Sequence, residues 1–153
     1  MTTSIRDAEA TDTETLCALA RRTISTSYRP FLGDAPVDAF IGSGAADQYV
    51  RENLARCRVI VQDEEIVGFC VCQAHLIDLM MIDQPVQRRG LGTVLLAHTE
   101  AQLFQRYSEL RLESFAGNTP ANRFYRKNGW READRRFDPQ SESTKIVFSK
   151  TAK

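Results

Sequence analysis

The sequence predicts a mixed α/β domain in which one central sheet carries helices on both faces. Segments with strand-like alternation and segments with helical spacing follow one another in the order β-α-α-β-β-β-α-β-α-β-β. No internal repeat, linker or low-complexity tract interrupts residues 1–153. A chain of this length buries roughly two-thirds of its unfolded surface, enough for one core. We therefore expect a single domain with about seven mostly antiparallel strands flanked by four helices.

Two helices are expected between the first two strands. Thr11 or Asp12 can cap the first helix. Its apolar face consists of residues repeated at helical spacing: Leu16, Leu19, Ala20, Thr23 and Ile24. The segment 27–36 contains two prolines and a glycine, which predict a break. The second helix is expected at residues 37–55, with an interruption near its two glycines.

Short alternating or apolar runs predict the strands, and two further helices lie between the later ones. The strands are expected at residues 4–8, 57–62, 66–73, 76–83, 109–115, 130–137 and 144–149. A strongly amphipathic helix is expected from Gly90 to Arg106, with Val94 beside its apolar face. Asn118 can cap a shorter helix that ends at Asn128-Gly129.

Composition argues against several classes of function. The 20 basic and 20 acidic residues balance, so overall charge gives no reason to expect a nucleic-acid or membrane partner. The four cysteines and two histidines lack metal-site spacing, so we expect buried thiols and no bound metal. No signal-peptide layout is present, and no apolar run approaches the ~20 residues of a membrane span. We expect a soluble cytoplasmic protein, and an edge strand near the C-terminus would allow a homodimer.

The turn Gln87-Arg88-Arg89-Gly90-Leu91-Gly92 joins an apolar strand to a helix. First-turn amides of a helix lack an internal partner and its dipole adds partial positive charge, so this end favours anions. The glycines let a phosphate approach the backbone, while the glutamine and arginines add donors. The turn lacks both the G-x-G-x-x-G triple and a Gly-Lys-Ser/Thr ending. An anion site is predicted, but neither a dinucleotide fold nor a P-loop.

A second motif lies one strand downstream: Asn118-Thr-Pro-Ala-Asn122-Arg-Phe124-Tyr125-Arg-Lys-Asn-Gly129-Trp130. Together with the turn, it resembles the GNAT N-acetyltransferase superfamily. Members of that superfamily show an [R/Q]-x-x-G-x-[G/A] turn, a strand, and then N-x-x-A-x-x-[FL]-Y-x-x-x-G-[FW]. Both motifs match with their spacing intact, and the order of elements fits the whole chain. The resemblance implies a GNAT fold, acetyl-CoA as co-substrate and an amine as acceptor.

The resemblance also implies how acetyl-CoA would be held. In this family the strand before the turn separates from its neighbour at a bulge, so the backbone of Met81, Ile82 and Asp83 is expected to bond the pantetheine arm. The pyrophosphate is expected to contact the turn and first helical turn: Gln87, Arg88, Arg89, Gly90, Leu91, Gly92 and Thr93. Asn118 and Asn122 are expected to contact the cofactor or to fix the second helix. Gln84-Pro85 departs from the family's proline-then-acid order, which could move these contacts by one residue.

Three residues are candidates for acid–base roles. Tyr125 matches the family tyrosine that acts as general acid near the cofactor sulfur; the alternative is a core tyrosine whose hydroxyl caps a helix–sheet contact. An alkylamine has a pKa near ~10.4, so attack requires a base or a desolvating pocket. Glu113 matches a glutamate that acts through water in ribosomal-protein alanine acetyltransferases, or is an exposed strand residue. Asp78 competes for this role because an unpaired carboxylate in an apolar strand is costly.

The acceptor is less well defined. Tyr28 and Phe31 lie where family members shape the acceptor pocket, although a contact between helices would also explain them. Arg135 and Arg136 are expected to be solvated. The reaction we expect is acetyl transfer to a primary amine of a small molecule, by direct attack in a ternary complex. The alternatives are a protein N-terminal or lysine acetyltransferase, and a non-catalytic acyl-CoA-binding module.

Overall fold

The computed structural model describes residues 2–152 and contains one seven-stranded sheet in the order β1-β2-β3-β4-β5-β7-β6. The strands are β1 (Thr3–Asp7), β2 (Cys57–Gln62), β3 (Glu65–Gln73), β4 (Leu76–Ile82), β5 (Glu109–Phe115), β6 (Arg131–Asp138) and β7 (Ser143–Thr151). Neighbouring strands are antiparallel except β4 and β5, which are parallel. The predicted mixed, mostly antiparallel sheet is confirmed.

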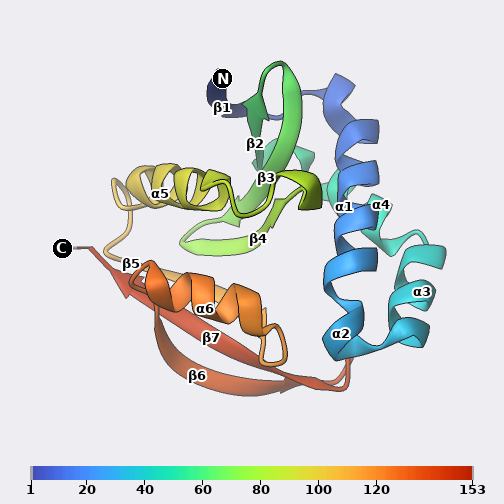
Figure 1. Cartoon of the computed structure of the whole chain (residues 1–153). Coiled ribbons are helices and arrows are strands. Elements are labelled where there is room, and N and C mark those ends of the chain that lie inside the picture. Colours follow the sequence, from blue (N-terminus) through green and yellow to red (C-terminus); the bar gives the residue numbers. More distant parts are fainter. Residues whose placement is uncertain (1, 153) are drawn as a thin grey trace.

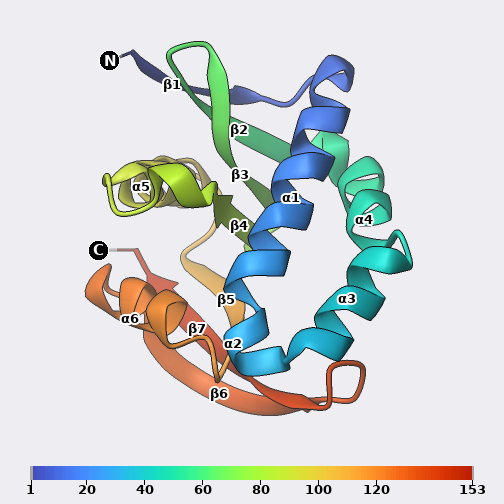
Figure 2. The ribbon, with the colours of Figure 1, turned by 45° about the vertical axis from the view of Figure 1, so that its right-hand side comes forward.

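Helices cover both faces of the sheet (Figures 1 and 2). The helices are α1 (Thr13–Ser27), α2 (Arg29–Leu32), α3 (Asp34–Gly42), α4 (Ala45–Asn53), α5 (Leu91–Leu103) and α6 (Thr119–Lys127). Helices α1, α3 and α4 pack on one face with β2 and β3, whereas α5 and α6 pack on the other. Short 3-10 turns at Ala10–Asp12, Leu54–Arg56 and Gln84–Val86 complete the elements.

The helical region between β1 and β2 differs from the prediction in two places. The segment expected to break the first helix forms the short helix α2, with a proline in its first turn. Proline is tolerated there because the first-turn amides have no helical partner. The expected second helix is divided into α3 and α4 at Gly44, whose φ of 80° interrupts the helical path. These differences give more than the four helices expected.

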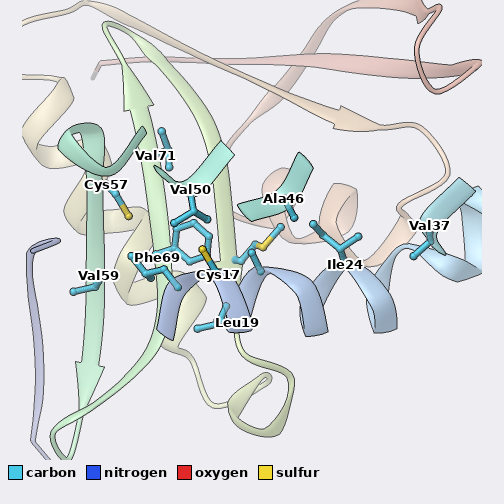
Figure 3. Packing of buried hydrophobic residues seen from close by; sticks show 13 residues of the cluster. Cys17, Leu19, Ile24, Val37, Ala46, Val50, Cys57, Val59, Phe69 and Val71 are labelled. Atoms are coloured by element: carbon cyan, nitrogen blue, oxygen red, sulfur yellow. The ribbon is translucent and has the colours of Figure 1, made fainter. Parts of the chain in front are cut away.

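The predicted apolar face of α1 forms the centre of one core. Its residues Leu16 and Leu19 are fully buried, and Cys17 of the same helix, Val50 of α4 and Phe69 of β3 join the cluster. Figure 3 shows this packing between helix α1 and the strands. At the start of α1, Asp12 accepts two hydrogen bonds from Arg6 and one from the Glu9 amide. The N-terminal strand and the first helix are thereby fixed to one another.

The core on the other face contains a charged pair that the sequence does not reveal. Glu100 of α5 is 8% exposed and accepts hydrogen bonds from Trp130 Nε1 (3.0 Å) and Lys150 Nζ (2.6 Å). The Lys150 ammonium also donates to the Asn128 carbonyl at 2.7 Å. This network joins α5, the end of α6 and β7. Val94, expected beside the apolar face of α5, is 47% exposed.

Replacing Lys150 with methionine leaves the Glu100 carboxylate buried without its cation. We expect Lys150→Met to lower the free energy of unfolding by about 3 kcal/mol, because an uncompensated buried charge is costly. The double variant Glu100→Leu/Lys150→Met removes both charges and should recover most of that loss. Urea denaturation at pH 7 measures both. A change of less than about 0.5 kcal/mol in Lys150→Met would contradict a structural role for the pair.

Candidate active site

The site begins where strands β4 and β5 separate. Their parallel ladder contains only the pairs Leu76↔Arg111 and Ile77↔Leu112. In the neighbouring ladder, Cys72 of β3 pairs with Ile77 and Val71 pairs with Leu79, so Asp78 is an extra residue in β4. Such a bulge bends a strand and ends its regular pairing. The two parts of the sheet diverge beyond this point (Figures 1 and 2), as the family resemblance predicts.

Only part of the β4 backbone faces this opening. The Asp83 amide donates to the Val67 carbonyl of β3 at 2.8 Å. Backbone groups alternate in direction along an antiparallel ladder, so Met81 and Asp83 point to β3 while Ile82 points to the opening. Of the three residues whose backbone was predicted to bond the pantetheine arm, only Ile82 turns its backbone groups toward the opening, and the contacts themselves stay predictions.

Side chains brace this end of β4. Gln87 Nε2 donates to the Ile82 carbonyl at 2.8 Å, so Gln87 supports the strand in addition to flanking the turn. The Asp83 carboxylate accepts hydrogen bonds from Arg22 of α1 at 2.9 and 2.7 Å. This ion pair ties the end of β4 to α1, and the predicted cofactor contact of Asp83 stays a prediction.

The turn before α5 presents unpaired amides. Within residues 2–152, the backbone N–H groups of residues 88–93 have no protein acceptor. The exposed side chains of Arg88 and Arg89 form no ion pair within the described chain. Gly90 and Arg88 adopt positive φ angles of 82° and 69°. Consecutive free amides at a helix start, with two free cations, have the chemistry of an anion site.

Gly92 and Leu91, which are expected to contact the pyrophosphate, also pack against the protein core. A Cβ on Gly92 would lie 3.3 Å from Phe124 Cζ of α6, so this glycine allows close packing of α5 against α6. Leu91 is 5% exposed and belongs to the core beneath the turn. Gly90 has nothing within 4 Å of its Cβ position, so the space beside it is open, as predicted for the approach of a phosphate. Thr93 is exposed in the first helical turn.

The two asparagines of the second motif hold α6 in place. Asn118 is the N-cap, and its side chain accepts a hydrogen bond from the Ala121 amide. Asn122 is 3% exposed, and its Nδ2 donates to the carbonyls of Phe115 and Ala116 at 3.1 Å. Both asparagines therefore fix the helix, and their contact with the cofactor stays a prediction.

The Tyr125 side chain projects from α6 between Phe124 and Phe148, with ring centroids 5.5 and 5.8 Å away. Among residues 2–152 its hydroxyl has no hydrogen-bond partner. It therefore does not cap a helix–sheet contact, which was the alternative to a catalytic role. Burial raises the pKa of Tyr125, and nearby Tyr28 raises this pKa further, so the hydroxyl stays protonated at neutral pH.

Asp78 was expected to be an unpaired carboxylate within an apolar strand, but its side chain is exposed and hydrogen-bonded. Its carboxylate Oδ2 accepts a hydrogen bond from the Tyr49 hydroxyl of α4. The bulge turns this side chain toward the α1–α4 layer, where solvent reaches it. Burial, followed by the bond to Asp78, raises the pKa of Tyr49. The expected buried, unpaired carboxylate is therefore absent at this position.

Glu113 lies on the same face of the sheet as the α1–α4 layer and is bound to Arg136 of β6. The Arg136 guanidinium donates to both carboxylate oxygens, at 2.6 Å from Nη2 to Oε2. Two residues along β5, Phe115 contacts Tyr28 and Phe31 with ring centroids 5.9 and 5.5 Å apart. Tyr28 and Phe31 thus form an aromatic cluster that packs α2 on β5.

Comparison with known proteins accounts for this arrangement. A family model described as acetyltransferase (GNAT) domain matches residues 53–132, more than half of the chain. This chain belongs to the GNAT acetyltransferase family. The matched residues include the turn before α5, the opening between β4 and β5, and α6.

Solved structures share the GNAT fold over nearly the whole chain. The PaiA N-acetyltransferase of Thermoplasma acidophilum, solved with coenzyme A, matches at 19% identity with a TM-score of 0.83, covering 99% of this chain and 100% of that chain. Apo-form YjaB of Escherichia coli matches at 25% identity and 0.79, covering 97% of each. A GCN5-related N-acetyltransferase of Rhodopseudomonas palustris matches at 16% and 0.86, covering 99% and 97%. Comparison with curated protein sequences gave no match.

Two partners in this GNAT site are not evident from the sequence. Tyr49 is 29 residues from Asp78, and Arg136 is 23 residues from Glu113. Neither pair has a local sequence signal, because each depends on how a distant helix or strand packs.

Within residues 2–152, no group of three or more His, Cys, Asp or Glu side chains could hold a metal ion. No helix in this described part is long and apolar enough to cross a membrane.

The different roles of Gly90 and Gly92 can be tested on the ligand-free protein. Gly92→Val places side-chain atoms against Phe124, and we expect the free energy of unfolding to fall by about 1–3 kcal/mol. Gly90→Ala meets no neighbour but strains a positive φ, and should cost about 1 kcal/mol. Urea denaturation gives both values. Wild-type stability in Gly92→Val would show that packing against α6 does not require this glycine.

Proposed function

We propose that this GNAT chain transfers the acetyl group of acetyl-CoA to a primary amine of a small molecule, by direct attack within a ternary complex. The observation that carries the proposal is the juxtaposition of a broken β4–β5 ladder, six unpaired amides and an unpartnered tyrosine hydroxyl. The Cβ position of Gly92 lies 3.7 Å from Ile82 and 3.3 Å from Phe124, which precedes Tyr125. The turn, the end of β4 and α6 therefore adjoin one another.

The residues around the opening fit the chemistry of acetyl-CoA. Acetyl-CoA supplies an activated acetyl group as a thioester, joined through a pantetheine arm to a pyrophosphate. The amides of residues 88–93 can donate to phosphate oxygens, and Arg88 and Arg89 can offset their charge. The outward-facing Ile82 amide lies along the expected path of the arm. The similarity to PaiA, solved with coenzyme A, supports this assignment.

Tyr125 is the residue we assign as acid. Its hydroxyl has no competing acceptor, and its raised pKa keeps the proton on Oη across the neutral range. An alkyl thiol has a pKa near ~8.5. Because tyrosine is the weaker acid, its hydroxyl stabilises a departing thiolate chiefly by donating a hydrogen bond.

Direct attack is favoured over an acyl-enzyme because the cysteines are poorly suited to act as nucleophiles. Cys17, Cys57 and Cys70 are buried. Burial raises the pKa of Cys57 to about 12, so this thiol is protonated and unreactive at neutral pH. Cys72 is partly buried on β3, and its hydrogen bond with Cys70, followed by burial, raises its pKa. The same hydrogen bond lowers the pKa of Cys70, but this thiol is 0% exposed and out of reach of a substrate. The amine is therefore the expected nucleophile.

Between the two candidate bases, the contacts favour Asp78. The Tyr49 hydroxyl engages only Oδ2 of Asp78, so Oδ1 is available to an amine or to a bridging water. Arg136 occupies both oxygens of Glu113, which must break an ion pair before accepting a proton. Asp78 is also the bulged residue immediately after the last β4–β5 pair. It is thus placed at the opening where the two substrates would meet.

The aromatic cluster supports a small acceptor. Phe31 of α2 packs on Phe115, and a Cβ on Gly117 would lie 2.8 Å from Phe31 Cβ. This close contact brings α2 onto the end of β5 and restricts the space beside Glu113. An extended peptide would need room there, whereas a compact amine would not. We therefore favour a small molecule over a protein N-terminus or lysine.

The function is tested by following free-thiol release from acetyl-CoA with a panel of amines, amino acids and peptides. We expect turnover with a small amine, and Tyr125→Phe should lower kcat about 100-fold or more because the hydrogen-bond donor is lost. Coenzyme A affinity, measured by calorimetry, should not change. Affinity for coenzyme A with no turnover on any amine would favour a non-catalytic binding module. Turnover on peptides alone would favour the protein acetyltransferase.

The raised pKa of Tyr125 predicts the alkaline side of the pH profile. A general acid is lost as pH rises through its pKa, and burial places this pKa above the ordinary value near ~10. We therefore expect the ionisation of Tyr125 to cause no fall in kcat between neutral pH and about pH 10. Any change of kcat in this range would come from the ionisation of the amine or of its base. A decline below that pH that disappears in Tyr125→Phe would contradict this assignment.

The choice of base is tested with isosteric variants. We expect Asp78→Asn to lower kcat by about 100-fold and Glu113→Gln to lower it by less than about tenfold. Both variants keep the size of the side chain, and each serves as the control for the other. Circular dichroism and coenzyme A binding verify that the fold is intact. The reverse order of effects would assign the base to Glu113.

A further inference from the structure

A basic pocket lies on the side of α6 away from α5. Its volume is about 330 Å³, and it is bordered by Thr119, Arg123 and Arg126 of α6 and by Arg135 and Ile146 of β6 and β7. Phe124, next to Arg123, faces the opposite way, toward Gly92 of α5. The pocket is therefore separated from the turn before α5 by the body of helix α6, which lies over β7 in Figure 1.

The three arginines leave the pocket with an excess of positive charge. Arg126 and Arg135 share one acid, Glu132, at 4.0 Å from Arg126 Nη2 and in direct contact with Arg135. Arg123 is exposed and forms no ion pair within residues 2–152. The adjacent acid on β6, Asp134, pairs across from Val147 and so points to the opposite face. One carboxylate thus offsets three guanidinium groups.

Part of the pocket wall is held in place without a ligand. The Arg126 guanidinium lies over the Phe148 ring, 5.4 Å from its centroid, which fixes its direction. Asn122 Nδ2 binds the carbonyls of Phe115 and Ala116 and so fixes the loop that forms one wall. Ile146, 2% exposed, forms an apolar floor. A preformed site loses less conformational freedom when it binds a ligand.

We infer that the pocket between α6 and β6 binds a small polyvalent anion, at a site distinct from the turn at residues 87–92. Planar guanidinium groups from a helix and a facing strand suit the oxygens of a phosphate or a carboxylate. The volume exceeds that of a single inorganic ion, and the apolar floor accommodates a carbon skeleton. The ligand class is therefore an organic phosphate or a di- or tricarboxylate.

The probes are citrate and inorganic phosphate, added to the full chain at constant ionic strength so that general screening does not change. Calorimetry and the melting temperature report binding. We expect Arg123→Gln and Arg135→Gln each to weaken citrate binding about tenfold or more, because each removes a charge-assisted contact. Arg106→Gln, an exposed arginine outside the pocket, is the charge-matched control and should bind as the wild type does.

A second experiment distinguishes binding at this pocket from binding at the predicted pyrophosphate site. Saturating coenzyme A, or Arg88→Gln with Arg89→Gln, should leave citrate affinity unchanged. Displacement of citrate by coenzyme A would overturn the inference, as would equal weakening in Arg106→Gln or the absence of binding by either probe. If phosphate binds more strongly than citrate, the ligand class is an organic phosphate. If citrate binds more strongly than phosphate, the ligand class is a di- or tricarboxylate. Either result supports the site.

Discussion

The parallel contact between β4 and β5 is limited to two residue pairs, and most of the candidate site depends on that limit. Beyond Ile77 the Asp78 bulge turns β4 away, so backbone groups in the middle of a sheet lose the partners that a continuous ladder would supply. A soluble fold tolerates such an opening where water or a ligand satisfies those groups. Arg22 and Gln87 keep the open end of β4 in position, one through Asp83 and the other through the Ile82 carbonyl.

The candidate residues come from the two layers on either face of the sheet. Tyr125 comes from the α6 layer, whereas Asp78 and Tyr49 face the α1–α4 layer. Burial raises the pKa of both Tyr49 and Tyr125, and Tyr28 raises both further. A tyrosine hydroxyl from one layer and a carboxylate from the other thus belong to opposite faces of the sheet that carries the opening.

Charge is distributed unevenly in this chain although its total is balanced. Arg88 and Arg89 are free at the turn before α5, and a second group of arginines borders the pocket beside β6. Acidic residues offset many of the other arginines through ion pairs, including those with Asp12, Asp47 and Asp83. Local potential depends on which charges remain unpaired after folding. A composition with equal acids and bases therefore does not exclude anion sites.

The sequence by itself determined the elements that depend on local patterns. Strands β2 and β5 were predicted to the residue, and Asn118 as the cap of α6, because alternation and capping act over a few neighbouring positions. The two GNAT motifs likewise identified the family, since each is a contiguous segment. Tertiary structure alone decided that Asp78 is exposed, that Arg136 holds Glu113 and that Glu100 is buried with Lys150. Those contacts join residues 23 to 50 positions apart, and their partners are set by how helices and strands pack.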